Sequence, residues 1–121
     1  MSEIIETRYV LAVPNLEASM QYYRDVLGFE LFVQPPGWAY LRRDALIVML
    51  GECPDALPVS ELGDHSYFAY IVVADAAALY TEFKDKGANI LKPLQTEPWE
   101  MKEFAIITID GHRLMFGEYI S

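Results

Sequence analysis

The pattern of apolar and polar residues occurs twice along the chain. Residues 8–31 (RYVLAVPNLEASMQYYRDVLGFEL) and 68–91 (FAYIVVADAAALYTEFKDKGANIL) each begin with a β-branched and aromatic run. Each continues with apolar residues at helical spacing and ends in a second extended run. A helix-capping side chain precedes each helical stretch and a glycine follows it: Asn15 and Gly28, then Asp75 and Gly87. Each half therefore predicts strand, helix, strand.

Two further strands are predicted at the end of each half. Residues 38–50 (WAYLRRDALIVML) alternate as two strands joined by a tight turn at Arg43-Asp44. Residues 104–120 show the same pattern, with Asp110-Gly111 as the hairpin turn. The sequence thus predicts an α+β protein of two tandem βαβββ modules, which form curved mixed sheets around a cavity.

We expect one domain over residues 1–121, with module 1 at about 5–51, a linker at about 52–65 and module 2 at about 66–120. The helix of each module covers one face of its sheet. The other face needs a cover, which is the second module, a partner chain or a ligand.

Composition and charge narrow the classes of partner. The net charge of −9, from 18 acidic and 9 basic residues, disfavours nucleic acid and anionic membranes and suits cationic ligands or simple solubility. No apolar run approaches the roughly 20 residues of a membrane span, and the N-terminus lacks the pattern of a signal peptide. The single cysteine, Cys53, excludes an intrachain disulfide. We therefore expect a cytoplasmic protein.

Three segments in order, VPNLEASMQYYRDVLGFEL, GWAYLRRDALIVML and PWEMKEFAIITIDGHRLMFGE, carry a family resemblance. Over about residues 7–119 the chain resembles the glyoxalase/bleomycin-resistance/dioxygenase group, the vicinal oxygen chelate superfamily. The resemblance implies paired modules around a cavity and a homodimer. It also implies that the related enzymes hold a divalent metal with His, Glu or Gln from the first and last strands of the modules.

In this chain the residues at the implied metal positions are Arg8, Phe68, Met115 and either Val48 or Met49, of which we prefer Met49. None is a ligand for a hard divalent cation, so we expect no metal cofactor. The two histidines are His65 in the linker and His112 near the hairpin tip, and both are expected to be solvated.

Strand alternation from these positions predicts a cavity face rich in aromatic and methionine side chains. Phe68, Tyr70 and Val72 are expected to share that face. Trp38 and Trp99, each near the start of a third strand, are interpreted as equivalent in the duplication. The ten candidate ligand-binding residues are Trp38, Trp99, Phe68, Tyr40, Tyr70, Met49, Met101, Met115, Arg8 and Glu103.

Alternatives stay open for several of these residues. The tryptophans are otherwise core or interface residues, and Phe68, Tyr70 and Met115 otherwise only pack the modules together. A charge such as Arg8 needs a partner, which is Glu103 or a ligand anion, unless the strand register differs by one and Arg8 faces solvent.

Three functions are compatible with these observations. The first, which we favour, is a non-catalytic protein of the bleomycin-resistance type that sequesters a planar aromatic, possibly cationic, molecule in a dimer crevice and so gives antibiotic resistance. The second is a lyase, isomerase or dioxygenase with an unusual metal site, or with metal-free acid–base work by Glu103, Tyr40 or Tyr70. The third is a small regulatory domain whose own side chains fill the cavity.

Overall fold

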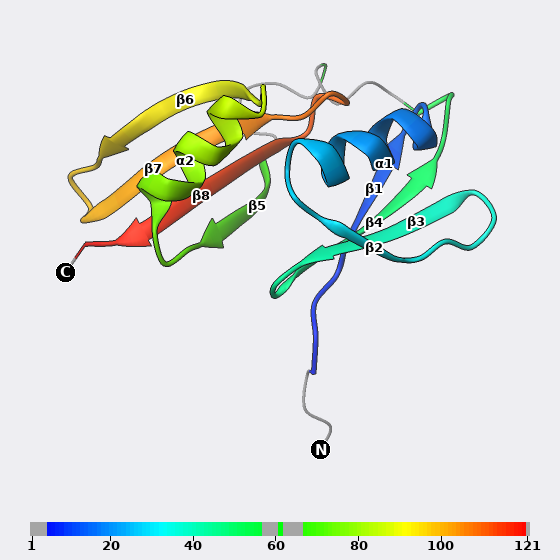
Figure 1. The fold of residues 1–121 in the computed structure, drawn as a ribbon, viewed down its shortest axis with the longest axis horizontal. Coiled ribbons are helices and arrows are strands. Elements are labelled where there is room, and N and C mark those ends of the chain that lie inside the picture. The colour runs from blue at the N-terminus through cyan, green and yellow to red at the C-terminus, as the bar shows by residue number, and fades with distance from the viewer. Residues whose placement is uncertain (1–4, 57–60, 62–66, 121) are drawn as a thin grey trace. The chain divides into compact units, whose positions relative to one another are not determined.

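The computed structural model describes residues 5–56, 61 and 67–120 (Figure 1). The chain divides into two compact units, Met1–Ala56 and Leu57–Ser121. Much of the predicted linker, including His65, lies outside the described residues. In the part of the chain that is described, no helix has the length and apolar character of a membrane-crossing segment.

The two units have the same topology. The elements of the first unit are β1 (Tyr9–Val13), α1 (Leu16–Asp25), β2 (Glu30–Val33), β3 (Trp38–Arg43) and β4 (Leu46–Glu52). Its sheet has the order β1-β4-β3-β2, in which β1 and β4 are parallel and the other neighbours antiparallel. The elements of the second unit are β5 (Tyr67–Val72), α2 (Ala76–Asp85), β6 (Asn89–Thr96), β7 (Met101–Ile107) and β8 (Arg113–Tyr119).

The second sheet has the order β5-β8-β7-β6, with β5 and β8 parallel and the other neighbours antiparallel. This arrangement confirms the predicted α+β fold of two tandem βαβββ modules with mixed sheets. The Asp110-Gly111 turn lies where the sequence placed it, whereas the turn predicted at Arg43-Asp44 is one residue later, at Asp44-Ala45, because Arg43 is still part of β3. Asp44 takes a left-handed φ of 53° between β3 and β4, and Gly111 takes a φ of 89° between β7 and β8.

The N-terminal cap of each helix is the residue that the sequence predicted. Oδ1 of Asn15 accepts a hydrogen bond from the Ala18 amide at 3.1 Å. Oδ1 of Asp75 accepts the corresponding bond from the Ala78 amide at 3.0 Å. These bonds satisfy amides of the first turn that have no partner within the helix.

A second carboxylate also supports each helix start. Glu52, at the end of β4, accepts a hydrogen bond from the Leu16 amide at 3.0 Å. Glu118, on β8, accepts one from the Ala76 amide at 2.8 Å. A negative charge at a helix N-terminus is favourable because the first amides point at it. The duplication therefore extends to a contact between the last strand and the helix of each unit.

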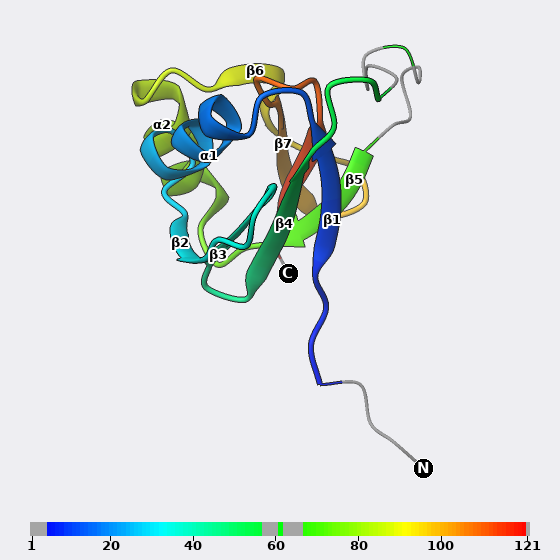
Figure 2. The same cartoon turned by 90° about the vertical axis from the view of Figure 1, so that its right-hand side faces the viewer.

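One face of each sheet is buried under its helix. Helix α1 packs on β3 and β4, on one side of the first sheet (Figure 2). Leu11 and Val13 on β1 are buried, whereas Val10 and Ala12, which alternate with them, are exposed, Val10 by 63%. In the second unit, the rings of Phe104 and Phe116 stack with centroids 5.0 Å apart, and Phe83 of α2 packs edge-on against both.

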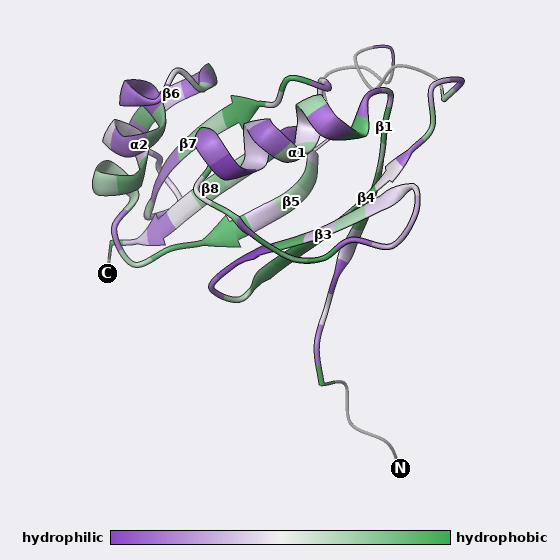
Figure 3. Cartoon of the chain, turned by 45° about the vertical axis from the view of Figure 1, so that its right-hand side comes forward, coloured by the Kyte–Doolittle hydropathy of each residue, from purple (hydrophilic) through white to green (hydrophobic). Residues whose placement is uncertain are grey.

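The distribution of hydrophobic and hydrophilic residues agrees with a core between each helix and its sheet. Hydrophobic residues run along the strands of both sheets, whereas the helices carry hydrophilic residues over much of their length (Figure 3). With one face of each sheet committed to its core, functional side chains are available on the opposite face.

Candidate functional site

Strand register shows which residues of the two modules are equivalent. Gly51 on β4 lies opposite Trp38 on β3, and Gly117 on β8 lies opposite Glu103 on β7. Each glycine directly precedes the glutamate that caps its helix. The counterpart of Trp38 in the second module is therefore Glu103, and the predicted equivalence of Trp38 with Trp99 is wrong. The sequence pattern placed both tryptophans near a strand start, but Trp99 lies in the turn before β7.

The same register favours Met49 over Val48 as the equivalent of Met115. Met49 and Met115 each lie two residues before the glycine of their strand. Val48 is fully buried on the helix side of its sheet, whereas Met49 is half-buried. Met101 precedes the strand pair predicted over residues 104–120, but in the structure it is the first residue of β7 and is buried.

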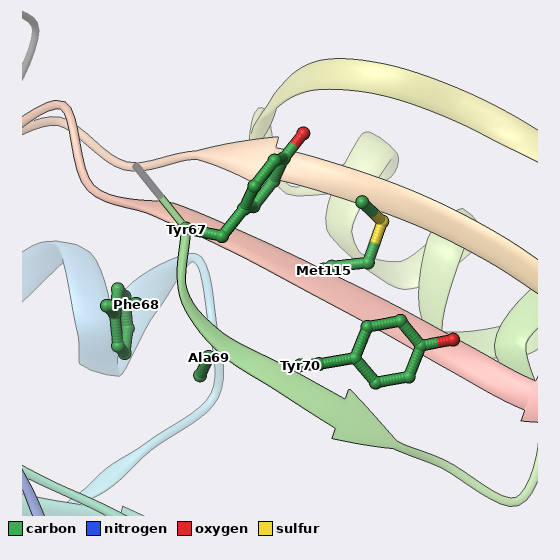
Figure 4. Close-up of a pocket in the computed structure, with 5 residues that line it drawn as sticks. All are labelled: Tyr67, Phe68, Ala69, Tyr70 and Met115. Atoms are coloured by element: carbon green, nitrogen blue, oxygen red, sulfur yellow. The ribbon is translucent and has the colours of Figure 1, made fainter. Parts of the chain in front are cut away.

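A β-bulge at Phe68 breaks the expected alternation on β5. Tyr67 pairs with Arg113 and Tyr70 pairs with Met115. An advance of three positions along β5 therefore matches an advance of only two along β8, which leaves one extra residue on β5. Tyr67 therefore shares a face with Tyr70 and Met115. Phe68, which regular alternation placed on that face, packs against His112 but still lines the same hollow as Tyr70 and Met115. Figure 4 shows Tyr67, Met115 and Tyr70 along β5 and β8, with Phe68 pointing away from them.

An open hollow runs along β5 in the second unit. Its volume is about 290 Å³, and Tyr67, Phe68, Ala69, Tyr70 and Met115 line it (Figure 4). The lining is aromatic and apolar, with a methionine side chain that can adapt to an irregular surface. The sequence analysis did not select Tyr67, because only the bulge brings it to this face.

A buried carboxylate next to the hollow holds two exposed rings. Glu103 is 3% exposed, and its Oε2 accepts hydrogen bonds from the Tyr70 hydroxyl at 2.6 Å and from Nε1 of Trp99 at 2.9 Å. Tyr70 is 46% exposed and Trp99 is 59% exposed. The structure thus brings three of the predicted residues together, with Tyr70 and Trp99 as donors and Glu103 as their shared acceptor.

Lys92 completes this cluster and ties it to a second carboxylate. Its Nζ lies 2.9 Å from Oε1 of Glu103 and 3.0 Å from Oε1 of Glu97. The same ammonium lies 5.7 Å from the centroid of the Trp99 ring, within the range of a cation–π contact. Two carboxylates and one ammonium leave a net charge of −1 beside the rings. Neither Lys92 nor Glu97 was selected from the sequence, since both lie on or after β6, outside the expected cavity strands.

Hydrogen bonding decides the protonation of the cluster. Burial by itself would raise the pKa of Glu103, but hydrogen bonds from Trp99, Tyr70 and Lys92 outweigh it and lower that pKa. Burial raises the pKa of the Tyr70 hydroxyl well above its usual range, and the hydrogen bond that this hydroxyl donates to Glu103 raises it further. At neutral pH Glu103 is thus an ionised acceptor and Tyr70 a protonated donor. This arrangement is suited to holding side chains in place, and a carboxylate with a lowered pKa is a weak general base.

Gly117 makes room for the Tyr70 side chain. A β-carbon at residue 117 would overlap the Tyr70 hydroxyl and would lie 3.1 Å from the methyl group of Met101. The ring can therefore cross β8 and reach Glu103 only because residue 117 has no side chain. Gly51 has a similar role in the first unit, where a β-carbon would lie 2.9 Å from the Trp38 ring.

In the first unit the free face of the sheet also carries aromatic residues. Trp38 packs edge-on against Tyr40, with centroids 6.3 Å apart. The guanidinium of Arg8 lies 6.0 Å from the Tyr40 ring and 5.8 Å from that of Phe32, so Arg8 shares their side of the sheet as predicted. Arg8 pairs with Glu6 at 2.7 Å, a partner not expected from the sequence.

The residues at the implied metal positions do not fit a divalent metal. Arg8 offers a guanidinium, Phe68 a phenyl ring, and Met49 and Met115 thioethers, whereas hard divalent cations take carboxylate, imidazole or other oxygen donors. Within residues 5–56, 61 and 67–120, no group of three or more His, Cys, Asp or Glu side chains is placed to hold a metal.

His112 is buried, so the expectation of a solvated turn histidine is wrong. Its side chain is 5% exposed and packs edge-on against Phe68, with ring centroids 5.9 Å apart. The turn folds the residue inward, because its amide donates to Oγ1 of Thr108 and its carbonyl accepts from the Thr108 amide. Burial lowers the pKa of the imidazole, which favours the neutral form.

Comparison with known proteins gives consistent results. A family model of the glyoxalase/bleomycin resistance protein/dioxygenase superfamily matches residues 7–116. Metallothiol transferase FosB of Staphylococcus haemolyticus is 27% identical over 105 residues, which cover 85% of this chain and 75% of FosB.

Two solved structures are similar over nearly their whole length. TioX from Micromonospora sp. ML1 is 25% identical with a TM-score of 0.78, over 95% of this chain and 98% of TioX. The bleomycin-binding protein of Streptomyces verticillus, solved with copper(II)-bleomycin, is 22% identical with a TM-score of 0.75, over 96% and 97% of the two chains. The family match spans most of the sequence, and the chain belongs to the glyoxalase/bleomycin resistance protein/dioxygenase superfamily.

Proposed function

We propose that this protein binds and sequesters a planar aromatic small molecule, preferentially a cationic one, and leaves it chemically unchanged. The observation that carries the proposal is the pair of exposed rings, Tyr70 and Trp99, that one buried carboxylate holds beside an apolar hollow. Flat rings with open faces bind planar ligands by stacking, which contributes about 0.5–1.5 kcal/mol per aromatic pair.

The charge of the site supports a cationic ligand. The Lys92 ammonium neutralises only one of the two carboxylates, Glu97 and Glu103, and the whole chain carries a net charge of −9. A positive ligand gains from this field and from the π faces of Trp99 and Tyr70. Met115, which lines the hollow, gives a surface that tolerates ligands of different shapes.

The fold shared with the bleomycin-binding protein of Streptomyces verticillus supports a binding role, and so do the side chains at the implied metal positions. By extension we propose a cytoplasmic homodimer with the ligand in a crevice, and a role in resistance to an antibiotic.

Catalysis is the second candidate, and the similarity to metallothiol transferase FosB favours it. Against it stand the thioether, phenyl and guanidinium groups at the positions where related enzymes are expected to hold a metal. The two candidate functions predict different outcomes for a bound compound. An enzyme converts it to a product, whereas a sequestering protein releases it unchanged.

The test is calorimetric titration of the purified protein with bleomycin, with copper(II)-bleomycin and with the planar cation proflavine. We expect binding of at least one of them without added metal, and recovery of the compound unchanged by mass spectrometry. Trp99→Ala should weaken that binding at least about tenfold, because the stacking face is lost. Ile109→Ala is the matched control, since Ile109 is also 59% exposed and lies in the turn at the other end of β7. Stoichiometric bound metal together with conversion of the compound would instead establish the enzyme.

A further inference from the structure

Packing alone does not fix the rings of Tyr70 and Trp99. Both are about half exposed, and an exposed aromatic side chain ordinarily samples several rotamers. Each ring carries one polar atom, and both polar atoms donate to the same oxygen, Oε2 of Glu103. The direction of both rings thus depends on one acceptor.

The backbone beneath Trp99 is already held in place. In the turn between β6 and β7, the Glu97 amide donates to the Met101 carbonyl at 2.8 Å, and the Glu100 amide donates to the Glu97 carbonyl at 3.1 Å. Glu100 takes a left-handed φ of 63° to close the turn. The remaining freedom of Trp99 lies in its side-chain torsions, which the bond from Nε1 to Glu103 restricts.

The Glu103 carboxylate is itself held in place, through the oxygen that does not bind the rings. Lys92 occupies Oε1 at 2.9 Å and leaves Oε2 to the two rings. The carboxylate lies on a central strand of the sheet, β7, and is almost fully buried. Burial, the Lys92 contact and the central strand together fix the position of this acceptor.

The first module has no such acceptor at the equivalent strand position. At the register position of Glu103 it carries Trp38, whose ring lies directly over Gly51. The polar anchor is consequently a property of the second module, so the two halves of the duplication have diverged in the use of this position.

We infer that Glu103 is a positioning residue that holds Tyr70 and Trp99 in the orientation that receives a planar ligand. This inference rests on the proposed function for the ligand, but the control of the rings by Glu103 can be measured without one. Ordering both rings before binding removes an entropic cost that the ligand would otherwise bear.

The experiment uses the full chain with Trp38→Phe, which leaves Trp99 as the only tryptophan. Glu103→Met then removes both acceptor oxygens while it keeps an unbranched side chain of similar length. Glu97→Met is the matched control, because it also removes a buried carboxylate from Lys92, whereas its hydrogen-bond donors are Lys92 and Gln95 rather than the rings. We measure the fluorescence anisotropy of Trp99 and its quenching by acrylamide, without ligand, and the affinity for proflavine.

We expect Glu103→Met to lower the anisotropy and raise the quenching constant, with the control close to the parent in both measurements. Both variants remove one negative charge near the rings, so the ring-holding role of Glu103 predicts that proflavine binding weakens about tenfold more in Glu103→Met than in Glu97→Met. Unchanged anisotropy and quenching in Glu103→Met would overturn the inference. If the parent binds no proflavine, that result counts against the proposed ligand class, and the ligand-free anisotropy still decides the role of Glu103.

A second variant covers the case in which Glu103→Met does not fold. Tyr70→Phe, made in the otherwise natural chain, keeps the whole six-membered ring and removes only the hydroxyl that donates to Glu103. Weaker proflavine binding, read from the anisotropy of the dye, supports the inference. Binding equal to that of the natural chain contradicts it.

Discussion

The Tyr70 hydroxyl lies directly over Gly117, at a place where any β-carbon would overlap it. This contact allows the tyrosine to cross β8 and donate to Glu103 at 2.6 Å. The glycine is thus as necessary to the candidate site as the residues that present functional groups to a ligand.

Gly117→Ala is expected to displace Tyr70 and to break its bond to Glu103. Overpacking of this kind costs about 1–3 kcal/mol of stability, measured as a shift in the urea unfolding midpoint. The same substitution in a Tyr70→Ala background should cost much less, because the ring is gone. Equal costs in the two backgrounds would show that the Tyr70–Gly117 contact does not constrain the site.

Acid is expected to destabilise the protein through the Glu97–Lys92–Glu103 cluster. Hydrogen bonds lower the pKa of both carboxyl groups in the folded chain below the ordinary value of 4.5. The unfolded chain then binds more protons, so stability is present above about pH 5 and is lost as the pH falls through the folded pKa values. Urea unfolding of the natural chain and of Glu103→Met between about pH 3 and 7 should show a shallower acid loss in the variant. Parallel curves would contradict this assignment.

His112 is expected to destabilise the protein at a less acidic pH. Burial lowers the pKa of its imidazole below the ordinary 6.5, and the charge of Asp110 opposes this effect only partly. The unfolded chain therefore takes up the proton first, and stability falls as the pH drops below about 6.5. Thermal unfolding between about pH 5 and 7.5 should show this slope in the natural chain and in a His65→Gln control, but a reduced slope in His112→Gln.

The second capping carboxylate of each helix is expected to differ in strength between the modules. Glu118 bonds the Ala76 amide at 2.8 Å in a partly buried setting, whereas Glu52 bonds the Leu16 amide at 3.0 Å in an exposed one. Glu118→Ala should therefore cost about 1–2 kcal/mol and Glu52→Ala about 0.5–1 kcal/mol. Chemical unfolding of the two variants measures the difference, and a larger cost for Glu52→Ala would contradict the account.

The fold could be predicted because its signals are local and occur twice. Asn15 and Asp75 mark the helix starts, and the apolar spacing after them sets the helix faces. The free face of each sheet was also predictable where alternation is regular, as at Arg8 and Tyr40. The same pattern of strand, cap and helix recurs about 60 positions later, so each copy supports the prediction made from the other.

The site was predictable only in part, because two of its determinants are not periodic. The bulge at Phe68 brings Tyr67 to the face of Tyr70 and Met115, and no alternation rule anticipates it. The roles of Lys92 and Glu97 depend on the pairing of β6 with β7, which brings residues from a separate strand to Glu103. His112 was misjudged because a short turn was assumed to be solvated.

The measurement that tests the central claim most directly is the NMR response of the two tryptophan indole N–H groups to proflavine. The Trp99→Phe spectrum assigns the signal of Trp99. The account predicts that the Trp99 signal shifts in a saturable way, without added metal, at the concentrations that titrate the protein by calorimetry. A Trp99 signal that stays in place while the protein becomes saturated with proflavine would contradict it.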